Sequence, residues 1–429
     1  MKRTQYYDPL YGKVELPTIF SDLIKQPVIL RLQSIGLMNF RSLSKLSLTS
    51  ITRLEHSIGT AILVDIMSKN EPRVRLKYNE YICSAIYHDI SCASFGHAVE
   101  WAIARYKDFD HVEIADWIIP GNSSINVNKP VRSGISPVGF LTKNLESSYK
   151  IDPKIVKSII DGEESCVINS ETMDLDNIDN VSRMALYIGL DFDKNLPISL
   201  ATNLRLSEDA KYFKIDKTNL YLVENWMDVR AKVYHDFIYS SDYISYEYMI
   251  FELVGKLYKS GGELALRQLT NLTDNELLKF SLELEESRDV STKLMNYDLP
   301  DCISIISTKN FDSIFLRENE AELHELITFI VNELSLLKLE VNEKDIGIHI
   351  TTDNRKTSRR VIIMCDNELI ELGDDVRKVL FGIIIKNKNL LKLSEKITNI
   401  LHKKIEEVFG NSKIEKKFIA NENLSLFDE

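Results

Sequence analysis

Two histidines and two aspartates are the residues of this 429-residue chain best suited to chemistry. His56 stands alone, His88 and Asp89 are adjacent, and Asp179 follows much further along the chain. Two imidazoles and two carboxylates suit a hard or borderline divalent metal ion that keeps positions open for water and a phosphate oxygen. Adjacent residues of a helix point in different directions, so His88 and Asp89 can reach one ion if it lies at a helix end. The pattern predicts a metal centre assembled from three segments.

The sequence around these residues resembles that of the HD-domain phosphohydrolases. The stretches that carry the resemblance are residues 52–59, TRLEHSIG, and residues 85–90, AIYHDI. Within that superfamily they are most similar to the deoxynucleoside triphosphate triphosphohydrolases, which include the bacterial dGTPase-like enzymes and the vertebrate enzyme that joins an HD domain to a sterile-alpha-motif domain. Chance supplies many His-Asp pairs, so the resemblance rests on the ordered set with its flanking sequence. It covers about residues 6–260 and is most specific over 50–112.

The resemblance also selects the fourth metal ligand. Asp174 and Asp176 lie close to Asp179, and the choice of Asp179 rests on residues 177–181 and 187–190, which resemble the family helix that carries the aspartate. Nitrogen and oxygen ligands permit manganese, iron, nickel, cobalt or zinc, and additional magnesium could accompany a nucleotide. We therefore expect one divalent transition metal of undetermined identity.

Groups for proton transfer follow the His-Asp pair. His97 and Glu100 are three residues apart and share a helix face, so the carboxylate can orient the imidazole as a general acid. The family has a histidine, an acid three residues later and a further histidine downstream, which implies that His111 completes a His-carboxylate-His group. The family histidine shortly after the His-Asp pair is Cys92 here. One phosphate or proton contact is therefore missing or replaced.

Substrate contacts are expected from several helices. Arg53 lies one helical turn before His56, where the family also has an arginine, and its planar fork suits a phosphate oxygen. Further contacts are implied by the resemblance alone, and these fall on Arg183, Tyr187, Arg230 and Tyr234. Asn180 stands where the family has a basic residue, and the aspartate that holds the sugar is missing. These differences concern base and sugar selectivity and leave the metal ligands intact.

Composition describes an ordinary globular protein. Hydrophobic residues make up 44% and charged residues 27% of the chain, and no apolar run approaches the ~20 residues of a membrane span. The N-terminus lacks a secretory stretch, and the five scattered cysteines without CxxC spacing predict reduced thiols in a cytoplasmic protein. A net charge of -11 argues against a main role in binding nucleic acid.

The expected fold is mainly α, an HD-domain helical bundle with a smaller C-terminal α/β lobe. Helical spacing runs from about 52 to 106 and from about 139 to 290, around a loop-rich insertion at 120–137. Short β-branched stretches at 347–352, 360–365 and 378–385 predict strands, and a last helix is expected at 390–408. The predicted organisation is an N-terminal segment, a catalytic domain and a regulatory or oligomerising lobe, which span 1–50, 51–290 and 291–429.

Composition and spacing by themselves reach only a phosphoester hydrolase. The resemblance implies hydrolysis of deoxynucleoside triphosphates (dNTPs) to deoxynucleoside and inorganic triphosphate. It also implies a homo-oligomer (dimer, tetramer or hexamer) with a nucleotide activator. The alternatives are another HD phosphohydrolase, such as a nucleotidase, a phosphodiesterase or a single-strand exonuclease, and a non-catalytic nucleotide sensor.

Overall fold

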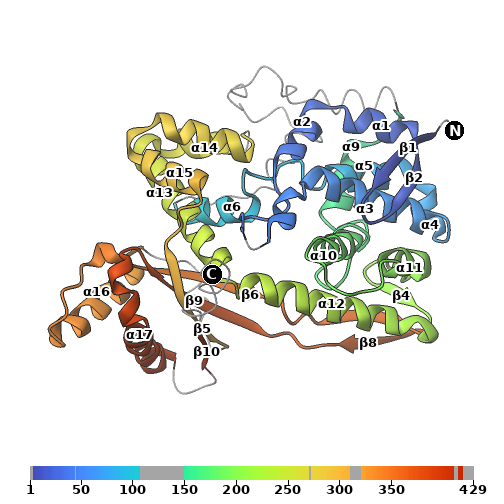
Figure 1. Ribbon diagram of the computed structural model, residues 1–429. Helices are drawn as coiled ribbons and strands as arrows, with labels where there is room; N and C mark the ends of the chain where they lie inside the picture. Colours follow the sequence, from blue (N-terminus) through green and yellow to red (C-terminus); the bar gives the residue numbers. More distant parts are fainter. Residues whose placement is uncertain are drawn as a thin grey trace, which may run out of the picture.

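The computed structural model describes residues 3–43, 45–106, 149–269, 272–309, 320–409 and 414–418. Helices form most of the chain, and strands gather mainly in its C-terminal part (Figure 1). The prediction of a mainly helical chain with a smaller C-terminal α/β lobe is confirmed. No helix in these ranges is both long and apolar enough to cross a bilayer. The five cysteines are buried and unpaired by disulfides.

The helical body begins with an antiparallel hairpin. Strands β1 (Arg3–Asp8) and β2 (Gly12–Pro17) flank a turn in which Asp8 Oδ1 accepts hydrogen bonds from the backbone N–H groups of Leu10 and Tyr11. Gly12 adopts a φ of 70°, a conformation that favours glycine. The remaining elements up to the site are α1 (Thr18–Ile24), α2 (Pro27–Leu30), η1 (Arg31–Ser34), η2 (Leu46–Ser50), α3 (Arg53–Ser68), α4 (Pro72–Leu76), α5 (Tyr78–Tyr87) and α6 (Gly96–Ala104).

Helix α3 is the centre of this body. Thr52 caps its N-terminus, because the Thr52 side chain accepts a hydrogen bond from the Glu55 N–H. Nearly all of its residues are buried, as α3 packs against α5 on one side and against α10 (Leu175–Tyr187) and α11 (Leu196–Asn203) on another. Gly59 lets α3 and α10 approach closely, since an added Cβ there would lie 1.9 Å from Asp179 Oδ1.

The helical stretch predicted over about 139–290 includes two long helices, α12 (Leu220–Ile238) and α13 (Ser241–Leu269). Other helices of the body are α9 (Pro153–Ile160), η4 (Lys217–Asn219), α14 (Asp274–Glu283) and α15 (Glu285–Asn296). The predicted insertion at 120–137 lies outside the described residues.

The C-terminal lobe contains a four-stranded sheet with the order β10-β5-β9-β6. Its strands are β5 (Asp301–Thr308), β6 (Ile346–Asn354), β9 (Arg377–Ile385) and β10 (Ile414–Phe418), all antiparallel to their neighbours. Helices α16 (Glu320–Leu336) and α17 (Ser394–Phe409) pack on one face and α13 on the other. The strands predicted at 347–352 and 378–385 are confirmed as parts of β6 and β9.

Burial on both faces explains the apolar sequence of β9. Val379, Phe381 and Ile383 pack toward α16 and α17, while Leu380 and Ile384 pack into the core of the body. Gly382 faces α13 at close range, because a Cβ there would meet Ile244 Cγ2 at 2.2 Å. The lobe is therefore continuous with the helical body.

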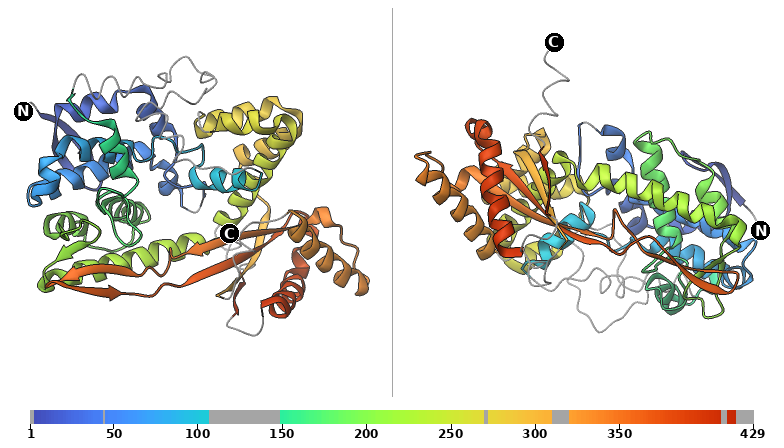
Figure 2. Two further views of the ribbon diagram at one scale, coloured as in Figure 1. Left: turned by 180° about the vertical axis from the view of Figure 1, so that it is seen from behind. Right: turned by 90° about the horizontal axis from the view of Figure 1, so that it is seen from below.

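A second sheet also contains strands from both the helical body and the C-terminal lobe. Its order is β3-β4-β7-β8, in which β3 (Arg205–Leu206) and β4 (Phe213–Ile215) come from the body and β7 (Val361–Cys365) and β8 (Glu368–Leu372) from the lobe. The β7–β8 hairpin extends along α12 toward α11 (Figures 1 and 2). The predicted boundary near residue 290 falls inside α15. The division into three segments stays a prediction.

Candidate metal centre and active site

Three side chains from three helices converge on one point in the body. His56 comes from α3, His88 caps the C-terminus of α5, and Asp176 lies in the first turn of α10. His56 Nε2 lies 2.7 Å from Asp176 Oδ1 and 3.2 Å from His88 Nε2, and His88 Nε2 lies 3.6 Å from Asp176 Oδ1. Two ligands each about 2.1 Å from a metal lie about 3.0 Å apart at a right angle and about 3.4 Å apart in a tetrahedron. The spacing fits the donor atoms of one coordination sphere.

The hydrogen bonds on the far side of each imidazole show which ring nitrogens face the cluster as acceptors. His88 Nδ1 lies 2.8 Å from the Ala85 carbonyl oxygen, and His56 Nδ1 lies 2.7 Å from Asp179 Oδ2. Each Nδ1 must donate to these oxygens, so a neutral ring presents a lone pair at Nε2. Two lone pairs and a carboxylate oxygen then face one another. This arrangement calls for a cation.

Asp179, the predicted ligand, lies on the other side of His56. Its Oδ1 accepts hydrogen bonds from Tyr11 Oη (2.7 Å) and Arg183 Nη2 (2.9 Å). Its Oδ2 accepts from Arg183 Nε at 3.0 Å and from His56. Both oxygens are occupied and the residue is fully buried. Asp179 thus orients His56, while the structure brings Asp176 to the cluster.

Asp89 lies beside the cluster with one oxygen unused. Its Oδ2 is 3.6 Å from His88 Nε2, and this atom is buried without a hydrogen-bond partner among the described residues. Its Oδ1 accepts a hydrogen bond of 2.8 Å from Arg53 Nη1. Gly96 makes room for that arginine, because a Cβ there would lie 2.4 Å from Arg53 Nη2. A buried carboxylate oxygen without a donor is a suitable fourth ligand atom.

Electrostatics agree with a site built for positive charge. Burial alone would lower the pKa of His56, but hydrogen bonds from its ring to Asp176 and Asp179 raise it to about 10. Burial opposes ionisation of Asp179, yet the nearby charge of Arg183 and the bond to His56 hold its pKa at about 2. The Arg53 charge outweighs burial and keeps the pKa of Asp89 well below its usual value. Proton and metal therefore compete for His56 Nε2.

The position of Asp176 follows from the start of α10. Asp174 is the N-cap, and its Oδ1 accepts a hydrogen bond of 2.7 Å from the Asn177 N–H. Asp176 then falls in the first turn, where the helix dipole favours a carboxylate. Sequence reasoning noted Asp176 without selecting it. The N-cap pattern identifies Asp174 as structural and places Asp176 in the first turn, but it does not exclude Asp179.

The predicted proton-transfer pair is present. His97 Nδ1 lies 2.8 Å from Glu100 Oε2 on α6, and the imidazole stacks on Trp101 with ring centroids 5.9 Å apart. Glu100 is buried, whereas the His97 side chain is 47% exposed and can reach a bound molecule. His111 lies outside the described residues.

The predicted substrate residues differ in their surroundings. Arg183 is fully buried, and all five of its donors bind carboxylates of Asp8, Glu55 and Asp179. No donor remains for a phosphate, so the structure places Arg183 in the interior as support for Asp179. Tyr187 donates to Glu55 at 2.9 Å.

The two α12 candidates lie together. Arg230 lies over the ring of Tyr234 at 4.6 Å, and both are buried. Arg230 Nη1 donates to backbone carbonyls of the segment between β6 and β7, while Arg230 Nε has no partner among the described residues. The neighbouring Asp176 carboxylate helps to raise the pKa of Tyr234, although burial is the main cause. Arg230 therefore connects α12 to the segment that follows β6.

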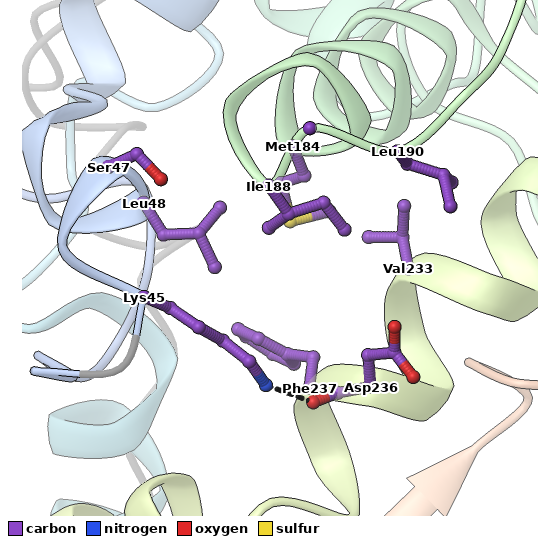
Figure 3. Close-up of a pocket in the computed structure, with 10 residues that line it drawn as sticks. Lys45, Ser47, Leu48, Met184, Ile188, Leu190, Val233, Asp236 and Phe237 are labelled. Atoms are coloured by element: carbon purple, nitrogen blue, oxygen red, sulfur yellow. Dashed lines mark hydrogen bonds between the residues drawn. The ribbon is translucent and has the colours of Figure 1, made fainter. Parts of the chain in front are cut away.

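A cavity of about 380 Å³ lies further along α10. Met184 of α10 and Ile188, the C-cap of that helix, face Val233 and Phe237 of α12 and Leu48 of η2 across it (Figure 3). Lys45 and Asp236 add polar groups. None of the metal-cluster residues lines the cavity. Met184 follows Asp176 by eight residues, which is about 12 Å along a helix.

The fold and cluster define a class: a mainly helical protein with a His/His/Asp site at the meeting point of three helices. Among solved structures the chain is similar to a phosphohydrolase from Bacteroides thetaiotaomicron VPI-5482, with a TM-score of 0.60 and 14% identity over 90% of this chain and 100% of that one. At this identity the likeness concerns the fold. No family model and no curated protein matches the chain.

Proposed function

We propose that this protein is a metal-dependent phosphohydrolase that cleaves deoxynucleoside triphosphates to deoxynucleoside and inorganic triphosphate. The observation that carries the hydrolase part is the convergence of His56 Nε2, His88 Nε2 and Asp176 Oδ1 with the unpartnered Asp89 Oδ2. The phosphohydrolase with the similar fold supports the same reaction class. The substrate comes from the resemblance of residues 52–59 and 85–90 to the dNTP triphosphohydrolases.

His56, His88, Asp89 and Asp176 would hold the metal. When bound, such an ion polarises a phosphoryl oxygen and lowers the pKa of water at the site. Asp179 fixes the ring of His56 so that Nε2 points into the cluster. Arg53 holds Asp89 in its ionised state.

In this proposal, His97 protonates the leaving group. Its Nδ1 donates a hydrogen bond to Glu100, so an imidazolium ring carries its second proton on Nε2 and becomes neutral when it passes that proton to the leaving group. Burial of Glu100 limits competition from water for this contact. The pair therefore positions one proton-transfer atom.

The cavity between α10 and α12 suits the nucleoside. Its volume falls within the usual range for small-molecule sites, about 300–1,000 Å³, and its walls are largely apolar. A phosphate at the metal and a nucleoside in the cavity would lie along the same helix.

One observation favours a second candidate, another phosphohydrolase such as a nucleotidase or a phosphodiesterase. Arg183, which the resemblance implied would bind triphosphate, donates its hydrogen bonds to the carboxylates of Asp8, Glu55 and Asp179 instead. Met184 is an apolar residue at the cavity and offers the sugar no hydrogen bond. A substrate with fewer phosphates would not need the Arg183 contact.

Product analysis decides between these candidates. Protein loaded with Mn²⁺ is incubated with each dNTP singly and as an equimolar mixture, and products are separated by ion exchange. Triphosphate plus deoxynucleoside, absent with His88→Ala, supports the proposal, and turnover only in the mixture indicates nucleotide activation. Monophosphate or diphosphate products would move the protein to the second candidate. No product with any metal or mixture would favour a nucleotide sensor.

A further inference from the structure

The segment 355–360 between β6 and β7 belongs to the C-terminal lobe but is held firmly against the helical body. Asp353, fully buried, accepts hydrogen bonds from the backbone N–H of Lys356 (2.8 Å) and of Thr357 (3.0 Å). Arg230 of α12 donates to the carbonyl oxygens of Arg355 and Lys356. The conformation of the segment is thus fixed from the sheet side and from α12.

One end of this segment reaches the metal cluster. Arg359 Nη1 donates to Asn177 Oδ1 at 3.1 Å, and Arg359 Nη2 donates to the Ser170 carbonyl oxygen at 2.9 Å. Asn177 is the chain neighbour of Asp176. The lobe therefore contacts the first turn of α10 directly beside a candidate metal ligand.

The other end reaches the proton-transfer pair. Lys356 Nζ lies 4.9 Å from the centroid of the Trp101 ring, and the same Trp101 ring stacks with His97. The segment therefore spans the site from the α10 side to the α6 side.

The ammonium group of Lys356 has no carboxylate partner in the described part of the chain. Among the described residues its side chain makes the contact with Trp101 and no ion pair, and the nearby Glu247 carboxylate is occupied by His349 and Tyr243. Burial lowers the pKa of Lys356, and the charges of Glu247 and Asp353 oppose this shift. A partly buried ammonium without an anion gains most from a ligand that supplies one.

We infer that Lys356 binds the phosphate chain of the substrate, so that the C-terminal lobe completes the active site of the helical body. Arg359 and Arg230 are positioning residues, because their guanidinium groups hold the segment in place. Lys356 supplies positive charge that Arg183, bound internally, cannot supply. This inference rests on the proposed function for the identity of the ligand as a phosphate chain.

Calorimetric titration with inorganic triphosphate tests the inference without turnover. Mn²⁺-loaded protein is compared with Lys356→Met, Lys356→Arg and, as a matched control, Arg360→Gln. Arg360 lies on the same segment, is exposed, and pairs with Glu371 at 3.1 Å. We expect Kd to rise at least about tenfold in Lys356→Met, since the variant loses a charge-assisted contact with the phosphate oxygens. Lys356→Arg should recover most of the affinity, and the control should match the wild type.

Unchanged triphosphate affinity in Lys356→Met would overturn the inference, as would equal weakening in Arg360→Gln. Failure of the wild type to bind triphosphate would overturn it as well. Circular dichroism and thermal midpoints of the four proteins separate lost binding from lost folding. Monophosphate as a reaction product would remove the proposed substrate while leaving the Lys356 effect on triphosphate binding intact, so the two failures are distinguishable.

Discussion

The Nε2 atoms of His56 and His88 lie 3.2 Å apart, and the Nδ1 atom of each ring is committed to an oxygen on its far side. Asp176 Oδ1 closes the group at 2.7 Å from His56 Nε2. A proton on His56 can satisfy this geometry in the metal-free protein, and a divalent ion satisfies it better because it binds all the acceptors together. Metal binding should therefore displace a proton from His56 Nε2.

Metal affinity should rise with pH. Carboxylate contacts raise the pKa of His56 to about 10 in the metal-free protein, so below that pH its ring carries a proton that the ion must displace. Each unit of rising pH makes this displacement easier, and we expect the apparent affinity for Zn²⁺ to increase roughly tenfold per unit between about pH 6 and 8. Titrations in two buffers of different ionisation enthalpy would report release of about one proton. Affinity independent of pH would contradict this reading of His56.

Asp179→Asn should weaken both the fold and the metal site. The amide cannot balance the buried charge of Arg183, and loss of one partner of a buried pair costs about 3–5 kcal/mol. His56 also loses the carboxylate that orients it, which should reduce metal affinity about 10- to 100-fold.

Denaturant titration and metal binding would measure the two effects of that variant. The matched variant is Asp176→Asn, whose side chain is 30% exposed and which should lose metal with little loss of stability. If Asp179 proved to be needed only for metal binding and Asp176 only for stability, the roles assigned to these two residues would have to be exchanged.

Gly59→Ala should destabilise the protein. Alanine normally stabilises a helix by about 1 kcal/mol relative to glycine. Here the methyl group would lie 1.9 Å from Asp179 Oδ1 and 2.2 Å from Arg183 Nη2. Forcing α3 and α10 apart should cost about 1–3 kcal/mol, seen as a lower denaturant midpoint. An increase in stability would show that the two helices are not in close contact.

Glu100→Gln should reduce kcat and leave KM and metal content nearly unchanged. The carboxylate fixes His97 through a bond of 2.8 Å from Nδ1 and does not belong to the metal cluster. The loss should be on the order of tenfold or more, because general acid catalysis contributes roughly 100-fold or more. Steady-state kinetics together with metal analysis would check this. A raised KM with unchanged kcat would assign Glu100 to substrate binding instead.

The sequence allowed prediction of the His56 and His88 part of the site because each residue lies in a distinctive local stretch. Asp176 and Asp179 could not be separated in this way, since both lie near the start of one helix. The choice depends on tertiary contacts: Gly59 brings α3 close to α10, and Tyr11 from the distant hairpin occupies Asp179. Residue spacing along α10 contains no information about either contact.

In the C-terminal lobe, too, some elements could be predicted from the sequence and others could not. Strands β6, β7 and β9 were predicted from β-branched residues, whereas β5 was missed. The β5 sequence, DCISIIST, is buried along almost its whole length, and its register shifts between Cys302 and Ser304, so it lacks regular alternation. The contact of segment 355–360 with α10 joins parts of the chain almost two hundred residues apart, as Arg359 and Asn177 show.

The most direct test of the metal centre is the metal content of the purified protein, measured by mass spectrometry after dialysis against excess Mn²⁺ and removal of unbound ion. The structure predicts close to one ion per chain in the wild type and close to none in His88→Ala and in Asp176→Asn. Full metal content in both variants, or none in the wild type, would contradict the assignment of the His56, His88 and Asp176 cluster as the metal site.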